Sequence, residues 1–485
     1  MRLACVRARS RILILRFIRR GGYADPPDHA AATLNGSEPE PDDQTNRHRQ
    51  KRRLFFLATT FPAPSPEKIS RQGITQDPTH HRQNPPQAGN LHLNETLADV
   101  VNTVTKIDQI ETMILDIPTI RGHVLSMATM RTQTAVLVRI RFSDGSEGIG
   151  EGTTIGGLSY GPESPEGIQS AIDTYIAPAL LGSDADNING AIQLIDKLVK
   201  GNRIAKTAVE IALWDGLGKR LGVPVSQLFG GAVHSKLPVA WTLASGNSET
   251  DIAEALQMIE IRRHNIFKLK IGKRSVREDV AHVARIKQAV GDAASVRVDV
   301  NTAWSLQDAR WGLKGLQDAG CELVEQPVQP RYRRAMAELT SGYEIAVMAD
   351  EALNGPEDAL EVANTKSADV FAVKIGQSGG LKRAAEVIAI AQAAGLGLYG
   401  GTMLETGLST AAALQLFATV ETLHWGTELF GPLLLTEDIL AEPIVYRDFC
   451  VEIPTGTGIG AALDPDKIAF FRRDGGRNIK AVAGQ

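Results

Sequence analysis

FKLKIG (267–272), SVRVDVN (295–301), LVEQP (323–327), MADE (348–351) and VFAVKIG (370–376) follow one another at nearly regular intervals, and this series decides the fold. Each segment is short and mostly apolar, as expected for a strand buried in a parallel sheet. Between them the pattern is helical: the apolar positions 276, 280, 283, 286 and 290 recur every three or four residues. Eight alternating strand–helix units indicate an α/β protein built on a TIM-type (β/α)-barrel. The predicted strands are residues 238–243, 266–271, 295–300, 323–325, 346–349, 370–375, 397–400 and 423–427.

A different pattern precedes the barrel. Residues 134–142 alternate as a strand, the turn sequence SDG (143–145) follows, and residues 147–150 return as a second strand. Helical stretches are expected at residues 163–181, 188–199 and 205–221. We therefore predict an α+β capping domain (105–234), then the barrel (235–473) with a C-terminal segment that returns to the cap, and a flexible tail (474–485).

The first 104 residues differ from the rest in composition. They begin with an arginine-rich stretch and continue as polar, proline-rich segments such as ADPPDHA and SEPEPDDQ. Such a segment cannot bury enough apolar surface to offset the entropy lost on ordering, so residues 1–104 are predicted to be a disordered extension. The formal net charge of −4 gives no reason to expect a nucleic-acid or membrane partner. The three widely spaced cysteines favour a reducing cytoplasm over a disulfide framework.

Acidic residues stand at the ends of three successive predicted strands. Asp299, Glu325 and Asp350 are separated by 26 and 25 residues, about one strand–helix unit each. Residues at the same phase of the repeat gather at the C-terminal mouth of a barrel, where functional groups lie in this fold. Three converging carboxylates would repel one another unless a cation lies between them, and they suit a hard ion such as Mg²⁺ or Mn²⁺. The alternative for each acid taken alone is a solvated loop residue.

Lysines occupy the same mouth. Lys268 and Lys270 are two apart on one strand and so share a face, and Lys374 follows a strand on the other side of the barrel. We expect repulsion between Lys268 and Lys270 to lower the pKa of at least one of them toward the range of a general base. A substrate between Lys270 and Lys374 could then exchange a proton at carbon from either face.

These motifs, taken in order, resemble the enolase superfamily in its muconate-cycloisomerase-like subgroup. Further matching segments are GLYGGTMLE (397–405), WGTELFGPLLLTEDI (425–439), the linker helix AVEIALWDGLGKRLGVPVSQLFGG (208–231), and, in the cap, DIPTIRGHVLSM (116–127) and GEGTTIGGLSYGPESPEGI (150–168). The resemblance runs from about residue 105 to 473.

The resemblance implies conversion of cis,cis-muconate to muconolactone in the β-ketoadipate route of aromatic catabolism. It also implies Mn²⁺ (with Mg²⁺ possible), a small dicarboxylate substrate and a homo-oligomer, an octamer in this subgroup. The expected site comprises Asp299, Glu325 and Asp350 for the metal, Lys270, Lys268, Lys374 and Glu428 for catalysis, and Ile155, Tyr160, Asn301 and Phe430 for the substrate.

Alternatives remain open within and outside this subgroup. A chloromuconate cycloisomerase, an N-acyl amino acid racemase or dipeptide epimerase, and an o-succinylbenzoate synthase share the lysine pair and the metal triad. The capping loop IGGLSY (155–160) favours the cycloisomerase. Outside the superfamily, a Schiff-base aldolase would use Lys270 or Lys374 as nucleophile and leave the acidic triad idle. A non-catalytic barrel would have no use for five charged residues at its mouth.

Overall fold

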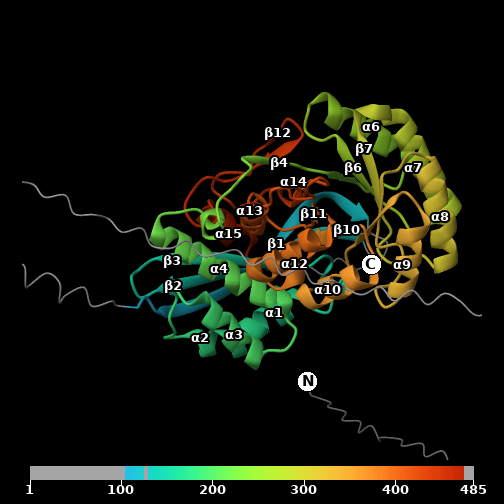
Figure 1. Ribbon diagram of the computed structural model, residues 1–485. Coiled ribbons are helices and arrows are strands. Elements are labelled where there is room, and N and C mark those ends of the chain that lie inside the picture. The colour runs from blue at the N-terminus through green and yellow to red at the C-terminus, as the bar shows by residue number, and fades with distance from the viewer. Residues whose placement is uncertain (1–103, 125–128, 475–485) are drawn as a thin grey trace, which may run out of the picture. The chain divides into compact units, whose positions relative to one another are not determined.

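The computed structural model describes residues 104–124 and 129–474 (Figure 1). The predicted extension 1–104 thus lies outside the described residues except for its last position, and the predicted tail 474–485 lies outside them after its first. Among the described residues, no helix combines the length and apolar character needed to cross a membrane.

The N-terminal part is built on a three-stranded antiparallel sheet in the order β1-β2-β3. Its strands are β1 (Ile107–Val124), β2 (Thr129–Phe142) and β3 (Glu147–Thr153). The predicted hairpin is confirmed, with Arg141 paired to Glu147 beside the turn and Ala135 paired to Thr153 at the far end. The sequence pattern had not indicated β1, which pairs with β2 along most of its length.

Helices cover this sheet closely because β3 carries glycines on the covered face. A Cβ on Gly148 or Gly150 would lie 2.0 Å from a carbonyl oxygen of Ala212 or Ala208 in α4. The predicted helical stretches are confirmed, although the first is interrupted by a π-helical turn. The helical elements of this part are η1 (Gly157–Ser159), α1 (Pro165–Ala171), η2 (Ile172–Ile176), α2 (Ala177–Leu180), α3 (Ile188–Leu198), α4 (Arg203–Leu221) and α5 (Val225–Leu228).

The C-terminal part is a barrel whose wall is a seven-stranded parallel sheet in the order β11-β10-β9-β8-β7-β6-β5. Its strands are β5 (Trp241–Leu243), β6 (Ile266–Lys270), β7 (Ser295–Asp299), β8 (Leu323–Glu325), β9 (Ala346–Ala349), β10 (Val370–Val373) and β11 (Gly397–Gly400). Neighbouring strands pair so that Lys270 stands beside Asp299, and Asp299 beside Glu325. This register brings the charged ends of successive strands to one edge.

The prediction of an eighth strand at residues 423–427 is wrong. This segment turns instead of extending, because Gly426 adopts a φ of 66° and its N–H donates to the carbonyl of Leu423 (2.9 Å). Thr427 alone closes the barrel wall: it makes isolated parallel bridges to Val239 on one side and Gly400 on the other.

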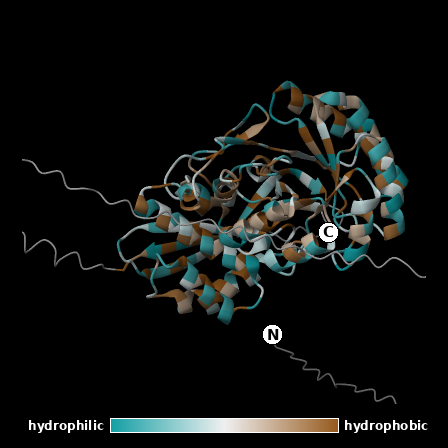
Figure 2. Ribbon diagram, in the orientation of Figure 1, coloured by the Kyte–Doolittle hydropathy of each residue, from teal (hydrophilic) through white to brown (hydrophobic). Residues whose placement is uncertain are grey.

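Outer helices surround the barrel and follow the strands in sequence. They are α6 (Ser248–Glu260), α7 (Val276–Val290), α8 (Leu306–Asp318), α9 (Arg333–Gly342), α10 (Pro356–Thr365), α12 (Leu381–Ala394) and α13 (Gly407–Phe417), with η3 (Gly291–Ala293) after α7. Three shorter helices face the N-terminal part: α11 (Ile375–Ser378) contacts α4, and α14 (Gly431–Leu434) and α15 (Pro465–Phe471) contact β1. Hydrophobic and hydrophilic residues alternate along these helices (Figure 2). In α7 the predicted apolar stripe is confirmed, since Val283, Ile286 and Val290 are buried.

The C-terminal part also holds a small third sheet, and the end of the described chain contacts the cap. The sheet has the order β12 (Tyr446–Arg447), β13 (Cys450–Glu452), β4 (Lys236–Pro238). The predicted strand 238–243 is therefore divided, with its first residue in β4 and only its second half in the barrel. At the end of the described chain, the Arg473 guanidinium donates to both carboxylate oxygens of Asp116 in β1, at 2.7 and 2.8 Å.

A buried carboxyl lies where α4 meets the barrel helix α12. Glu210 Oε1 accepts hydrogen bonds from Trp214 Nε1 and from the backbone N–H of Lys382, both at 3.2 Å, whereas Oε2 is buried and finds no partner in the described part of the chain. Burial raises the pKa of Glu210 to about 7. The folded chain therefore holds a proton here between pH 4.5 and about 7 that the unfolded chain has released, and its stability falls as pH rises through that range.

Replacing Glu210 by glutamine removes this titration. We expect Glu210→Gln to gain stability relative to the wild type as pH rises from 5 to 8, by at most about 3 kcal/mol. Urea unfolding of both proteins across this pH range measures the difference. Glu386→Gln, at an exposed position of α12, is the matched control and should follow the wild type. Parallel stability profiles for Glu210→Gln and the wild type would contradict the assignment.

Candidate active site

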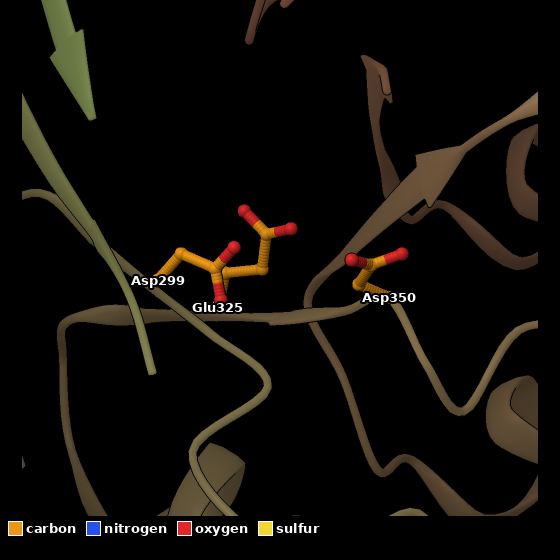
Figure 3. Close-up of side chains that lie close together, drawn as sticks. All are labelled: Asp299, Glu325 and Asp350. Atoms are coloured by element: carbon orange, nitrogen blue, oxygen red, sulfur yellow. The ribbon is translucent and has the colours of Figure 1, made fainter. Parts of the chain in front are cut away.

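Three buried carboxylates meet at the C-terminal edge of the barrel. Asp299 ends β7, Glu325 ends β8 and Asp350 directly follows β9. Each is only 1% exposed, and one oxygen from each lies within 4.8 Å of the others. Figure 3 shows the three side chains gathered in one space. The parallel register produces this cluster, because it aligns the ends of adjacent strands.

The cluster fits a divalent cation. Glu325 Oε1 and Asp350 Oδ1 are buried and have no hydrogen-bond partner within the described part of the chain. Carboxylate oxygens are the ligands that Mg²⁺ and Mn²⁺ prefer. A cation among Asp299, Glu325 and Asp350 would satisfy these atoms and offset the repulsion between the acids.

Each of the three acids is also paired with a lysine, and Asp299 lies near a second one, with its Oδ2 3.8 Å from Lys268 Nζ. Lys270 Nζ lies 2.5 Å from Asp299 Oδ2, and Lys374 Nζ lies 2.7 Å from Asp350 Oδ2. Lys268 Nζ donates to Glu325 Oε2 at 2.8 Å. The lysines hold one oxygen of each acid and thereby orient the carboxylates.

Lys268 differs from the expectation for a pair of neighbouring lysines. Burial by itself would lower its pKa, but the carboxylates of Glu325 and Glu428 outweigh burial and hold the pKa well above its usual value. The predicted lowering is therefore wrong for Lys268: the sequence shows the lysine two residues away but not the two acids that pair with it. The same balance of burial and a nearby acid, Asp350, raises the pKa of Lys374.

Glu428 follows the residue that closes the barrel wall. Its Oε2 accepts from Lys268, and its Oε1 accepts from Thr242 Oγ1 in β5 at 3.0 Å. Its predicted place at the site thus depends on Thr427 bridging two strands, and not on a strand of its own.

Asn301 is held beside the triad in an unusual backbone conformation, with a φ of 44°. Its side-chain amide donates to Asp299 Oδ2 (3.1 Å) and to Glu351 Oε1 (3.2 Å). Glu351 is a site residue that the sequence reasoning left out, although it directly follows Asp350. Burial, together with Asp350 and Asp299, raises the pKa of Glu351 to about 8.

The capping part closes over the lysines. Tyr160 Oη donates to Asp350 Oδ2 (2.8 Å) and accepts from Lys374 Nζ (2.6 Å). Between the cap and the lysines lies a small pocket, in which the centre of a water molecule could occupy a volume of only about 10 Å³. It is lined by His123, Ile155, Tyr160, Lys268, Lys270, Lys374, Thr402, Leu404 and Glu428.

The structure does not bring every predicted substrate residue into this pocket. Ile155 and Tyr160 line it, whereas Asn301 lines an adjacent cavity of about 410 Å³ that shares Tyr160. Phe430 is not among the lining residues: it is buried, with its ring 5.0 Å from that of Trp241. His123, Thr402 and Leu404 line the pocket without having been predicted. All three lie within the quoted motifs, but nothing in the spacing of those motifs pointed to them.

Comparison with known proteins agrees with this architecture. Residues 109–230 match the family model described as "Mandelate racemase / muconate lactonizing enzyme, N-terminal domain", and residues 251–467 match "Enolase C-terminal domain-like". Muconate cycloisomerase 1-1 of Acinetobacter lwoffii is 57% identical over 76% of this chain and 97% of that protein. A chloromuconate cycloisomerase of Cupriavidus pinatubonensis is 42% identical over 76% of this chain and 99% of that protein.

A solved structure leads to the same group. The crystal structure of muconate lactonizing enzyme from Pseudomonas fluorescens, complexed with muconolactone, superposes with a TM-score of 0.76. It is 53% identical in sequence and covers 76% of this chain and 100% of that chain. With both domain models matched in order and more than half of the aligned residues shared with a curated relative, the chain belongs to the muconate cycloisomerase family of the enolase superfamily.

Proposed function

We propose that this chain is an isomerase that converts cis,cis-muconate to muconolactone with the help of a divalent metal ion, in the breakdown of aromatic compounds. The observation that carries the proposal is the triad of Asp299, Glu325 and Asp350 with Lys270 and Lys374 in ion pairs at its two ends. The relatives named above act on muconate or its chlorinated form, and the identity to the muconate enzyme is the higher of the two.

The proposed roles follow the geometry. One carboxylate oxygen of muconate forms a bond to the β-carbon of the other carboxylate, and the electron pair of the double bond moves toward the α-carbon. Lys270 then delivers a proton to that α-carbon, with Lys268 beside it. Lys374 stands at the opposite end of the triad, where its charge faces the substrate from the other side. No atom or electron beyond those of substrate and lysine is needed.

Asp299, Glu325 and Asp350 are proposed to hold the metal ion, and Mn²⁺ is the proposed ion, with Mg²⁺ as the other candidate. Such an ion would bind a substrate carboxylate and offset the negative charge that develops on it. Glu428 keeps Lys268 charged and in place through its ion pair. Ile155 and Tyr160 enclose the substrate, Asn301 positions Asp299, and Phe430 supports the wall beside Trp241.

A lactonisation assay tests the proposal directly. Purified full-length chain with Mn²⁺ should consume cis,cis-muconate and release muconolactone. The racemase, epimerase and o-succinylbenzoate synthase alternatives predict turnover of N-acyl amino acids, dipeptides or the cyclohexadiene precursor instead. An aldolase would be trapped by borohydride on Lys270 or Lys374 in the presence of a carbonyl substrate. If muconate is consumed no faster with the protein than in the same solution without it, the proposal is overturned.

Substrate preference is a separate prediction. We expect unsubstituted muconate to be preferred over its 2-chloro and 3-chloro forms, because Ile155 is buried against a pocket with little free space and a chlorine needs room. Misfit of one small group corresponds to about 10–200-fold in specificity. The measurement compares kcat/KM for the three substrates. Ile155→Val, which enlarges the pocket, should reduce the ratio of kcat/KM for muconate to kcat/KM for each chlorinated form. A chlorinated substrate that equals or exceeds muconate would contradict the prediction.

Assembly and location extend the proposal. We propose a homo-oligomer, an octamer by resemblance to the subgroup, with a small dicarboxylate as its substrate. The proposed location is the cytoplasm, in keeping with Cys321 and Cys450, which are not joined in a disulfide. Light scattering of the purified chain measures the assembly.

A further inference from the structure

One polar side chain in the active-site pocket has no partner. His123, near the end of β1, is 1% exposed, and neither Nδ1 nor Nε2 has a hydrogen-bond partner among the residues that the structure describes. The other two buried histidines of the described residues differ: His264 Nδ1 bonds the Val239 carbonyl at 3.1 Å, and His282 Nδ1 bonds Ser248 Oγ at 2.7 Å. Burying a polar group without a hydrogen-bond partner costs folding free energy, and a ligand in the pocket would supply the partner that His123 lacks.

The remaining polar residues of the pocket are already engaged. Tyr160, Lys268, Lys270, Lys374, Thr402 and Glu428 each hydrogen-bond within the protein. His123 is therefore the one polar residue lining this pocket, among those described, whose hydrogen-bonding capacity is wholly unused.

A neighbouring residue attaches this end of β1 to the barrel. Two residues earlier, Arg121 Nη2 donates to the Thr242 carbonyl (3.1 Å) and to Glu254 Oε1 (2.9 Å), which ties this end of β1 to β5 and α6. Tyr160, by contrast, covers the side of Asp350 and Lys374. Two capping side chains thus reach the pocket over different parts of the barrel wall.

The geometry points to His123 as the residue that hydrogen-bonds the second carboxylate of muconate, the one whose oxygen closes the lactone ring. This inference rests on the proposed function and adds to it a specific donor for the dicarboxylate. The acidic triad, with its cation, is proposed to take one end of the substrate, and the other end needs a donor in the same pocket. A ring N–H that holds one oxygen leaves the second oxygen free to form the C–O bond, and it can stay bonded to the lactone carbonyl that results.

The surroundings of His123 support a neutral donor. Burial, followed by the positive charges of Lys270, Arg121 and Lys268, lowers its pKa to about 3. A neutral ring donates one hydrogen bond without competing with Lys270 as a proton source. The same positive charges favour an anion as its partner.

The experiment uses the full chain loaded with Mn²⁺ and two inhibitors of equal length, adipate with two carboxylates and hexanoate with one. His123→Phe keeps a ring of similar shape but no donor, and His123→Asn keeps an N–H. We expect His123→Phe to raise the inhibition constant of adipate and the KM of muconate about 10–100-fold, with kcat changed much less, because the bond persists through the reaction. Hexanoate inhibition should be unchanged, and His123→Asn should recover part of the adipate affinity.

Controls separate this role from packing. His264→Phe, which alters a second buried histidine outside the pocket lining, should leave both inhibition constants at the wild-type value. If His123→Phe does not fold, His123→Leu provides the same comparison. Equal weakening of adipate and hexanoate, or no change in either, would overturn the inference. If the wild type binds adipate but does not turn over muconate, the proposed function fails but the inference about His123 can still be tested. Calorimetry then measures the binding of adipate and hexanoate to the wild type and to His123→Phe in place of the inhibition constants.

Discussion

Exhaustive chelation of divalent metal is expected to abolish muconate turnover, and addition of Mn²⁺ or Mg²⁺ to restore it. The reason lies in the triad: Asp299, Glu325 and Asp350 converge within 4.8 Å, and two of their oxygens have no partner in the described protein. Without a cation, a substrate carboxylate would meet only negative charge from these groups. The measurement is turnover of the chelated and of the reconstituted protein. In the chelated protein, turnover should fall to the detection limit of the assay.

Stability gives a second measure of the same site. A ligand that binds only the folded state raises the melting temperature as its concentration rises. Mn²⁺ should therefore stabilise the wild type and have little effect on Glu325→Gln, which lacks one of the proposed ligand oxygens. Asp318→Asn, on the exposed surface of α8, is the control and should respond as the wild type does. Full activity after exhaustive chelation would rule out an essential metal.

Lys270→Ala is expected to lower kcat by about 10²–10⁴, the usual contribution of general acid–base help. Lys270 Nζ is paired with Asp299 and lines the pocket, so its removal takes away the proposed proton donor while leaving the strand itself in place. The melting temperature of Lys270→Ala should stay close to that of the wild type. The measurement is kcat for muconate at saturating substrate and Mn²⁺.

Two comparisons make the Lys270 result specific. Lys273→Ala removes an exposed lysine three residues along the chain and should retain wild-type turnover. A small primary amine added to Lys270→Ala should recover part of the activity by occupying the space of the lost ammonium. Near-normal turnover of Lys270→Ala would show that another group carries the proton, with Lys374 the next to test.

The sequence by itself determined the repeat and the phase of the charges. Alternating apolar segments and helical stripes are local patterns, so they predict strands and helices wherever burial follows a regular period. Because parallel strands end at one edge, the spacing of Asp299, Glu325 and Asp350 was sufficient to predict that they converge. The division into a 105–234 cap and a 235–473 barrel stays a prediction, as do the catalytic roles of the individual residues.

Tertiary structure decided whatever depends on contacts between distant segments. The eighth strand is replaced by a turn at Gly426, and Thr427 then closes the barrel through bridges to Val239 and Gly400, contacts between distant segments that no local pattern records. The pKa of Lys268 rises because Glu325 and Glu428, 57 and 160 residues later, surround it. Phe430 packs on Trp241 at the start of the barrel, and His123 of the cap lines the pocket, so both placements depend on contacts between segments far apart in the chain. Sequence periodicity specifies which face of an element is buried, but the partners that each buried polar group finds are set by the assembled fold.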